Sequence, residues 1–486
     1  MSISAPPGVF DILPIDRDEL WKSSYLWQHV EEAILAICKE YGYQEIRTPL
    51  FERTELFKRG VGESSDIVSK EMYTFLDKGD RSLSLRPEAT APVIRAYIEH
   101  QLNQIAPIHK LFCIAPMFRY ERSQAGRYRQ HHQFDVEAIG NDSPEQDVEV
   151  IDLLYTLYNR LGLKNLKLCL NSIGDPATRI AYRDALKAFL KTSYDNLSSD
   201  SKQRFEVNPL RILDSKDASD RKILENAPSI LDFLSEESRE HFSKVQKLLK
   251  QLKIPFTVSP QLVRGLDYYN KTVFEIVAGE LGAQNSIGGG GRYDGLMKQL
   301  GGPDLPTIGF GTGLERIIQT LLKQEIAVPF SAKPTIFLIA LGDAAQETCF
   351  TILHELRQSG VSSYMDFSGR KVGKAMQLAD QMQAKYVAVV GDSELKSGEV
   401  DLKEMATGEI IKAPLHNLPR ILYLESRGKE LIEIWQEMSE PFKESSEAQF
   451  FIKRLSKTIA STKNAAQELQ SVIESLQEKD ESVEKG

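Results

Sequence analysis

The stretch Lys110–Gly140, KLFCIAPMFRYERSQAGRYRQHHQFDVEAIG, predicts two antiparallel strands joined by a polar loop. Lys110–Tyr120 is apolar and favours a strand, Glu121–Gly126 is small and polar, and Arg127–Ile139 resumes as an extended run. Successive side chains of a strand point to opposite faces, so one face of the second strand is almost entirely polar: Arg127, Arg129, His131, Gln133, Asp135 and Glu137. A sheet with such a face is either exposed to water or holds a polar ligand.

The composition is that of a globular protein with room for about three domains of roughly 150 residues. The chain has 486 residues, of which 41% are hydrophobic and 27% charged. Its net charge of −9 gives no overall attraction to nucleic acid. Any contact with RNA must therefore depend on local basic patches.

The cysteines and the apolar runs indicate a reduced, cytoplasmic environment. Four cysteines lie far apart, with no CxxC pair and no Cys/His cluster, which argues against a zinc site and predicts free thiols: Cys38, Cys113, Cys169 and Cys349. No apolar run is long enough to span a membrane, and the first residues lack the features of a signal peptide. We expect no membrane contact and no bound structural metal.

The N-terminal region predicts a helix followed by short strands. Apolar residues recur with helical spacing over Asp18–Glu40, and a strand over Gln44–Thr48 ends at Pro49. Glu71–Leu76 and Ser82–Leu85 are predicted to pair. By themselves these segments indicate only a generic helix–strand unit.

A helix is predicted after Arg86, with Pro87 in its first turn and its end near His100. On the residues alone, Glu88 would be a favourable negative charge at the N-terminus of this helix. Further on, Pro144–Leu161 predicts a helix and Leu166–Ser172 a buried strand. Residues from about 175 to 255 carry mainly helical patterns and indicate a helical insertion.

Two later segments contain turns and glycines. Leu262–Asn270, LVRGLDYYN, predicts a turn-containing hairpin that continues into a strand over Thr272–Ala278. Ser286–Leu296, SIGGGGRYDGL, predicts a strand that enters a four-glycine turn, since glycine readily adopts positive φ. Thr307–Leu322 predicts a strand that turns into a helix, and its glycine spacing is not that of a dinucleotide-binding loop.

The last third of the chain predicts a separate α/β domain. Pro329 and Pro334 indicate a linker, after which apolar strands alternate with amphipathic helices and Asp401–Ile411 adds an edge hairpin. The expected organisation is a first domain over 1–325, a linker over 326–333, an α/β domain over 334–426 and a polar extension over 427–486. The extension has a partial heptad pattern, and a surface helix, a coiled coil and disorder all remain open.

Several of these segments resemble the class II aminoacyl-tRNA synthetases, and in detail the histidyl-tRNA synthetases. Phe118–Arg122 followed by Gly126–Gln130 is similar to the second class motif, and Thr307–Leu322 is similar to the third. The helix, strand and proline near the N-terminus resemble the first motif, which in the family builds the interface of a homodimer. LVRGLDYYN and SIGGGGRYDGL match signatures of the histidyl enzymes. The resemblance covers about Pro7–Ile411 and implies an α+β fold with a class II antiparallel sheet, a helical insertion and an anticodon-binding α/β domain.

The resemblance implies that histidine and ATP form histidyl-adenylate and pyrophosphate, and that the histidyl group then passes to the 3′ end of tRNA(His). Negative charge accumulates on ATP during the first step, so fixed cations are needed. Arg119 would hold the α-phosphate, Arg316 the γ-phosphate end and Arg264 the substrate carboxylate. Mg²⁺ is expected to bridge phosphate oxygens. The residues implied to bind ATP are Arg119, Glu121, Arg127, His131 and Arg316.

A neutral imidazole ring offers one hydrogen-bond donor and one acceptor, which a carboxylate and a hydroxyl can match. The resemblance assigns these roles to Glu137 and Tyr269. The residues implied to bind histidine are Glu88, Thr90, Gln133, Glu137, Tyr268 and Tyr269. A site built on buried hydrogen bonds needs no editing domain.

The chain departs from the family pattern at two positions. Ala89 stands where the family has glycine, and His131 stands where it has a phenylalanine that stacks on adenine. Weakened or pH-sensitive ATP binding is expected from the second change. The residues implied to contact tRNA are Arg122, Gln124, Arg370, Lys371 and Lys374.

Two alternatives from other functional classes are a non-catalytic regulatory paralogue and an RNA-binding or sensor module. Regulatory paralogues typically lack the C-terminal domain and the catalytic arginines. This chain retains both, which favours the enzyme.

Overall fold

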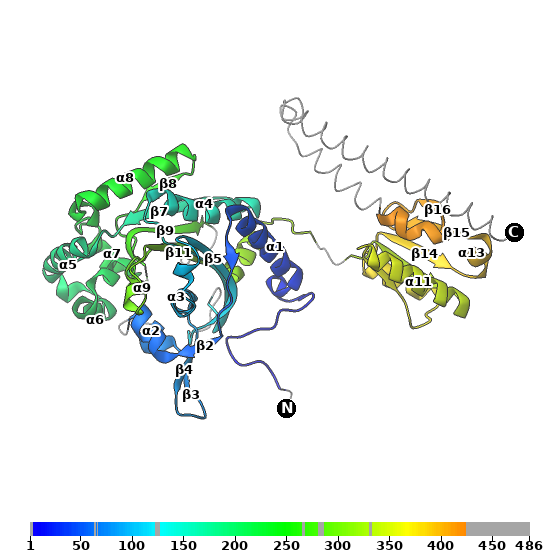
Figure 1. The fold of residues 1–486 in the computed structure, drawn as a ribbon, viewed down its shortest axis with the longest axis horizontal. Coiled ribbons are helices and arrows are strands. Elements are labelled where there is room, and N and C mark those ends of the chain that lie inside the picture. Colours follow the sequence, from blue (N-terminus) through cyan, green and yellow to red (C-terminus); the bar gives the residue numbers. More distant parts are fainter. Residues whose placement is uncertain are drawn as a thin grey trace, which may run out of the picture. The chain divides into compact units, whose positions relative to one another are not determined.

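A computed structural model describes residues 3–62, 65, 67–121, 127–264, 268–279, 286–329 and 333–423. The chain divides into two compact units, Met1–Phe330 and Ser331–Gly486. Figure 1 shows the helices and strands of both units. No helix in the described ranges is long and apolar enough to cross a membrane. The extension expected over 427–486 lies outside the described residues.

The first unit is built on an eight-stranded sheet within the described residues (Figure 1). The strands follow one another across the sheet in this order: β1 (Gln44–Glu45), β5 (His109–Phe118), β6 (Gln130–Ile139), β11 (Thr307–Gly313), β10 (Ser286–Arg292), β9 (Asn270–Ala278), β7 (Leu166–Ser172) and β8 (Phe256–Val258). All neighbours from β5 to β7 are antiparallel, and only the outer pairs β1/β5 and β7/β8 are parallel. The expected class II antiparallel sheet is confirmed.

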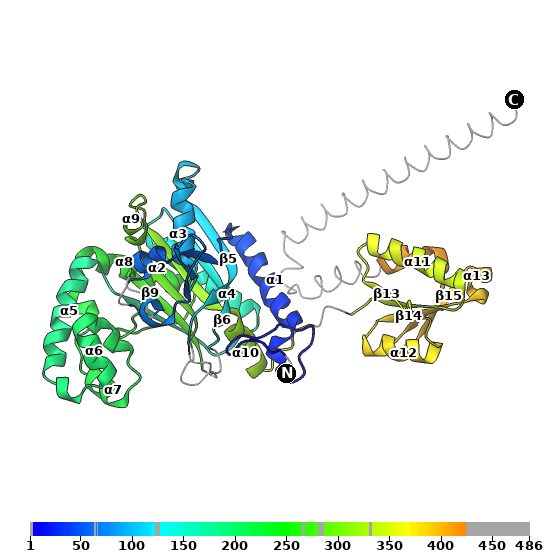
Figure 2. The same ribbon diagram turned by 90° about the horizontal axis from the view of Figure 1, so that it is seen from below.

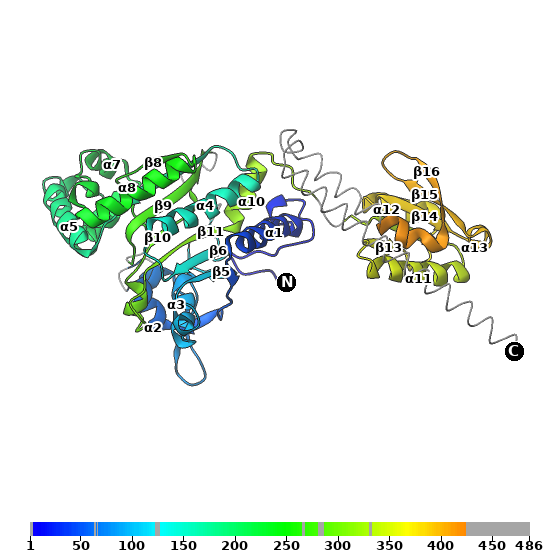
Figure 3. The same cartoon turned by 45° about the horizontal axis from the view of Figure 1, so that its top comes forward.

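One face of this sheet is covered by α1 (Ser24–Tyr41), α4 (Pro144–Arg160) and α10 (Leu314–Lys323), which lie side by side in Figure 3. Their apolar faces and the apolar face of β6 form one hydrophobic core, which includes Phe134 and Val136. This face of β6 is therefore buried by helices. The polar face of β6 points the other way, toward the remaining segments of the unit.

Those segments include a small sheet with the order β2 (Phe51–Arg53), β4 (Ser82–Leu85) and β3 (Thr74–Leu76), and three helices: α2 (Thr54–Val61), α3 (Thr90–Glu99) and α9 (Leu296–Gln299). The helical insertion follows β7 and consists of α5 (Pro176–Lys191), α6 (Ser199–Val207), α7 (Ala218–Leu224) and α8 (Glu236–Gln251) (Figure 2). Each of its four helices begins after a Ser or Asp whose side chain accepts backbone N–H groups of the first turn.

Three N-terminal elements are shorter than the sequence predicts: two helices begin later, and one strand ends earlier. The helix predicted from Asp18 starts at Ser24, because Ser23 is extended and its hydroxyl accepts the N–H of Asp16. The predicted strand over Gln44–Thr48 is only β1, since the carbonyl of Thr48 accepts from the buried Arg86 guanidinium instead of a neighbouring strand.

The helix predicted to contain Pro87 in its first turn begins at Thr90, so that prediction is wrong as well. Glu88 precedes the helix, and its carboxylate accepts the N–H groups of Thr90 at 3.0 Å and Ala91 at 2.8 Å. The Glu88 carboxylate thus satisfies N–H groups of the first helical turn, which have no acceptor within the helix.

The turn predicted for the glycine-rich segment is also wrong. The four glycines Gly288–Gly291 lie within strand β10 and form no turn. The turn predicted within Leu262–Asn270 falls on residues 265–267, which lie outside the described residues, and the strand that follows, β9, begins at Asn270. Pairing with β9 and β11 on its two sides keeps the glycine-rich segment extended.

The second unit has a five-stranded sheet with the order β13 (Ser363–Met365), β12 (Ile336–Ala340), β14 (Tyr386–Val390), β15 (Glu399–Glu404) and β16 (Ile410–Pro414). The first three strands are parallel and the last two add an antiparallel edge. Successive residues of β12 belong to different cores, one on each face of the sheet. Its helices are α11 (Asp343–Gln358), α12 (Val372–Gln381) and α13 (Asp392–Ser397), with α11 and α12 on opposite faces (Figure 2). The predicted α/β domain is confirmed.

Candidate active site

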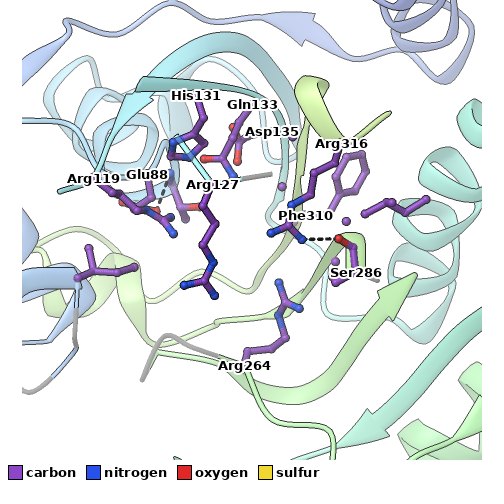
Figure 4. A pocket seen from close by; sticks show the side chains of 18 of the residues that line it. Glu88, Arg119, Arg127, His131, Gln133, Asp135, Arg264, Ser286, Phe310 and Arg316 are labelled. Carbon is purple, nitrogen blue, oxygen red and sulfur yellow. Dashed lines mark hydrogen bonds between the residues drawn. The ribbon is translucent and has the colours of Figure 1, made fainter. Parts of the chain in front are cut away.

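A cavity of about 320 Å³ lies over the polar face of β6 in the first unit. Residues from the central strands and from the loops around Arg119 and Arg264 line it, and Figure 4 shows their side chains. The sequence-predicted residues that it brings together are Glu88, Thr90, Arg119, Glu121, Arg127, His131, Gln133, Arg264, Tyr268, Tyr269 and Arg316. The polar face of β6 is thus a ligand-sized site, as one of the two sequence interpretations requires.

The glycines of β10 and β11 make room for the polar side chains of β6. Gly309 pairs with Glu137 and Gly311 with Asp135 across the β6/β11 ladder. A Cβ at Gly309 would lie 2.1 Å from Glu137 Oε2, and one at Gly311 would lie 2.7 Å from Asp135 Oδ1. A Cβ at Gly289 would lie 2.9 Å from Arg264 Nη1. These glycines are therefore needed for close approach across the sheet.

Four arginines surround the cavity (Figure 4): Arg119, Arg127, Arg264 and Arg316. Arg119 Nε donates to the carbonyl of Pro87 at 2.8 Å, and Arg316 Nη1 donates to the carbonyl of Ser286 at 2.5 Å. Arg264 pairs with Glu275 at 3.1 Å. Backbone and carboxylate partners hold these cations in place, so little reorganisation is needed when an anionic ligand arrives.

Burial and the charge of Arg127 lower the pKa of Arg316. The two cations therefore repel each other across a partly desolvated space. A polyphosphate placed between them would remove this repulsion. The cavity thus favours a ligand with several negative charges at this end.

Three carboxylates are buried at the site: Glu88 and Asp135 line the cavity, whereas Glu137 is not among its lining residues and lies next to Gly309, which is; they are 4%, 6% and 2% exposed. Burial raises the pKa of all three, and the backbone N–H of Ala91 opposes the effect at Glu88. Glu137 Oε2 accepts a hydrogen bond from the Tyr293 hydroxyl. Among the described residues, Glu137 Oε1 has no hydrogen-bond partner. A buried carboxylate oxygen in this state costs free energy unless a donor reaches it.

Tyr293 is a residue of the site that the sequence analysis did not single out. Its ring lies 5.3 Å from that of Tyr268, which in turn lies 4.8 Å from the ring of Tyr269. Tyr293 immediately follows the four glycines and Arg292 in the quoted motif, so the signal was present in the sequence. What the sequence lacked was the contact with Glu137, which is distant along the chain.

His131 lines the cavity next to Arg119. Burial, and after it the charge of Arg119, lowers the pKa of His131 to about 3. Its imidazole is therefore neutral across the physiological range. A neutral ring is able to stack on a base, and the pH-sensitive ATP binding expected from this residue stays a prediction, because bound phosphates would offset the charge of Arg119.

Arg316 owes its position to the start of α10. The preceding residue, Glu315, is 2% exposed. Its Oε1 atom accepts the backbone N–H of His132 at 2.8 Å and lies 3.0 Å from the ring Nδ1 of the same residue. His132 lies on the helix-covered face of β6, against the ring of Trp27 at 4.9 Å. This contact joins α1, β6 and α10 behind the cavity.

Of the residues implied to contact tRNA, only three are described, and none of these three lines the cavity. Arg122 and Gln124 lie outside the described residues. Arg370, Lys371 and Lys374 lie in the second unit, at or just before the start of α12. Arg370 pairs with Asp366 at 2.5 Å.

Comparisons with known proteins cover both units. A family model described as histidyl-tRNA synthetase matches residues 17–317, and one described as anticodon binding domain matches residues 335–423. The histidine–tRNA ligase of Protochlamydia amoebophila is 66% identical over 418 residues, which cover 86% of this chain and 99% of that protein. The histidine–tRNA ligase of Desulfitobacterium hafniense is 48% identical over 423 residues, covering 87% of this chain and 98% of that protein.

Solved structures agree. The apo histidyl-tRNA synthetase of S. aureus superposes with a TM-score of 0.73 at 38% identity, covering 87% of this chain and all of that one. A histidyl-tRNA synthetase from Nostoc sp. PCC 7120 has a TM-score of 0.65 at 21% identity over 88% of this chain and 100% of that one, which shows the shared fold alone.

Proposed function

The chain belongs to the histidyl-tRNA synthetase family, and from this premise we propose how its residues activate histidine and deliver it to tRNA. Its reaction is that of a histidine–tRNA ligase: histidine and ATP give histidyl-adenylate and pyrophosphate, and the histidyl group then passes to tRNA. The observation that carries the residue assignment is a single cavity whose lining combines four arginines with the buried carboxylates Glu88 and Asp135. No finding favours the non-catalytic alternatives.

Arg119, Arg316 and Arg264 are the electrostatic catalysts in this proposal. Attack of the histidine carboxylate on the α-phosphorus increases the charge on the phosphate oxygens, and cations already in place stabilise that charge. Arg119 binds the α-phosphate, Arg316 the γ-phosphate end, and Arg264 the carboxylate of histidine. Glu121, Arg127 and His131 complete the ATP site, with the neutral His131 ring stacked on the adenine.

Mg²⁺ enters this scheme with the nucleotide. Among the described residues, no group of three His, Cys, Asp or Glu side chains could hold a metal ion. Mg²⁺ usually binds one or two carboxylates together with substrate phosphates and water, and Glu121, which lines the cavity, would supply one of them. When bound, Mg²⁺ would neutralise part of the charge on ATP.

Glu137 and Tyr269 read the two ring nitrogens of histidine in this proposal, with Tyr268 packed beside them. Glu137 Oε1, which has no partner among the described residues, accepts the ring N–H, while Tyr293 holds Oε2. Glu88, Thr90 and Gln133 bind the α-amino group. An amino acid without these ring nitrogens would leave buried polar groups unpaired, which costs free energy.

Replacing Glu137 by Ala is expected to raise the KM for histidine by roughly ten- to a hundredfold, because a hydrogen bond to a charged group contributes about 1.5–3 kcal/mol. The KM for ATP should stay within about threefold of wild type. Histidine-dependent ATP–pyrophosphate exchange measures both constants. Glu149→Ala is the matched control, since Glu149 is ion-paired with Lys110 outside the cavity. Equal changes in both constants would show that Glu137 is structural.

The second unit is the proposed tRNA-reading part of the chain. In addition to Arg370, Lys371 and Lys374, this unit has two exposed phenylalanines that the sequence patterns did not indicate. Phe350 is 57% and Phe367 55% exposed, and their ring centroids are 6.2 Å apart. Phe367 lies in the loop that leads to Arg370. Exposed aromatic rings beside cations are typical of surfaces on which unpaired RNA bases stack.

Replacing Phe350 and Phe367 together by Ala should lower kcat/KM for tRNA by about tenfold or more, since stacking contributes about 1–3 kcal/mol per base. ATP–pyrophosphate exchange should not change, because neither residue lines the activation cavity. Ile410→Ala is a suitable control, as Ile410 is 57% exposed on β16 at the other edge of this sheet. An unchanged kcat/KM for tRNA would remove the two rings from the RNA surface.

A homodimer and a cytoplasmic location complete the proposal. The helix α1 and strand β1 resemble the segment that builds the dimer interface in the family. Leu35, Leu50 and Phe51 are 49%, 45% and 52% exposed in this region and would supply apolar surface to such an interface. Aminoacylation of tRNA for translation supports the cytoplasm as the place of action.

A further inference from the structure

Asp135 is a buried carboxylate of the cavity for which neither the motifs nor the family comparison supplies a role. It lies on β6 between Gln133 and Glu137, on the same face of the strand. The residue is 6% exposed and lines the cavity. Within the described part of the chain, its Oδ2 atom has no hydrogen-bond partner. A buried carboxylate oxygen in this state costs free energy unless a ligand supplies a donor.

The backbone opposite Asp135 preserves the space that such a ligand needs. Its partner across the ladder is Gly311, and a Cβ there would come within 2.7 Å of Asp135 Oδ1 and 3.3 Å of Gln133 Nε2. Both side chains therefore lie against the same glycine. Figure 4 shows Gln133 and Asp135 side by side at the wall of the cavity, on the side of Glu88 and Arg119.

The charges around Asp135 indicate what it binds. After burial, the main influence that raises its pKa is the negative charge of Glu88, while Arg86 and Arg119 oppose it. Glu88 already uses both oxygens to accept N–H groups of α3. Two carboxylates that repel each other in a desolvated site favour a cation between them.

Three acceptors without a partner in the described residues can be assigned to the two ends of histidine, the ring and the amino group. Glu137 Oε1, beside Tyr293, suits the single N–H of a neutral ring. Asp135 Oδ2 and Gln133 Oε1, both without a partner in the described residues, remain. An ammonium group has three donors and a full positive charge, and it matches these two acceptors next to Glu88.

We propose that Asp135 binds the α-ammonium group of histidine, with Gln133 as its neighbour and Glu88 as the second carboxylate. The proposal rests on the proposed function and adds a specificity-determining residue to it. Asp135 thereby discriminates an α-amino acid from imidazole compounds that lack the amino group.

The test measures binding of three compounds by calorimetry without ATP: histidine, histidinol, which retains the ammonium group but lacks the carboxylate, and imidazole-4-propanoate, which lacks the ammonium group. The variant Asp135→Asn keeps the side-chain volume and removes the charge. It should weaken histidine and histidinol by roughly ten- to a hundredfold, the range expected for a charged hydrogen bond. Imidazole-4-propanoate should bind within about threefold of its wild-type affinity.

Asp135→Ala is the second variant, because it introduces no new donor and tests the same loss if the Asn variant folds poorly. Retained binding of imidazole-4-propanoate reports an intact site in either variant. Equal weakening of all three compounds would overturn the proposal, since Asp135 would then read the ring or shape the pocket. Unchanged binding of histidine and histidinol would overturn it too. Wild-type protein that binds none of the three would instead contradict the proposed function on which it rests.

Discussion

Arg264→Ala is expected to lower the rate of histidine-dependent ATP–pyrophosphate exchange by at least ~10²-fold, because loss of one preorganised electrostatic stabiliser commonly costs about 3–4 kcal/mol. Arg264 lines the cavity, and its Nη1 contacts Glu275 at 3.1 Å. Gly289 leaves the space that this guanidinium occupies. Its place and charge suit the carboxylate of histidine at the reacting phosphorus.

The control for this variant is Arg183→Ala, which removes an arginine of α5 that pairs with the neighbouring Asp184 and does not line the cavity. Its exchange rate should equal that of wild type. Size-exclusion chromatography and thermal unfolding should show that Arg264→Ala remains folded and assembled. Exchange within about threefold of wild type would contradict the assignment of Arg264 to the reacting centre.

A chain that ends at Phe330 is expected to retain histidyl-adenylate formation and to lose transfer to tRNA by about 10²-fold or more. All residues that line the cavity precede this boundary. The first of the two compact units of the chain also ends there. Losing two base-stacking contacts of about 1–3 kcal/mol each is enough for that decrease. The measurement compares exchange with aminoacylation of tRNA in the same preparation.

The full-length Phe350→Ala, Phe367→Ala protein is the reference for the shortened chain, since it keeps the second unit and lacks only the two rings. Aminoacylation that survives the truncation would show that the second unit does not read RNA. Loss of exchange from a well-folded shortened dimer would show that the first unit depends on the second for activation. The proposed domain boundary would then be wrong.

Local sequence patterns were sufficient for most helices and strands. Strand β7 occupies the predicted range Leu166–Ser172, because a short apolar run between a helix and polar residues has few alternatives. Helix α4 starts at the predicted Pro144, after Ser143, whose side chain caps it. The alternation of β12 to β14 with α11 and α12 was predicted for the same reason. These signals depend on residues close together in the chain.

The polar face of β6 was also visible in the sequence, since a period of two places Gln133, Asp135 and Glu137 together. The two interpretations of this face, a surface exposed to water and a ligand site, differ only in whether other segments cover the face. Residue similarity to the histidyl-tRNA synthetases decided the function from sequence. It could not decide which acceptors remain unpaired.

The sequence by itself therefore determined the family, the main elements and the face on which the chemistry occurs. Only the tertiary structure decided that Gly288–Gly291 continue a strand, that Tyr293 contacts Glu137 and that Asp135 lies buried opposite Gly311. Glycine permits both a turn and an extended strand, and local preference does not choose between them. The choice is made by strands distant along the chain, because in a sheet the neighbour that fills or leaves the space above a side chain comes from another segment.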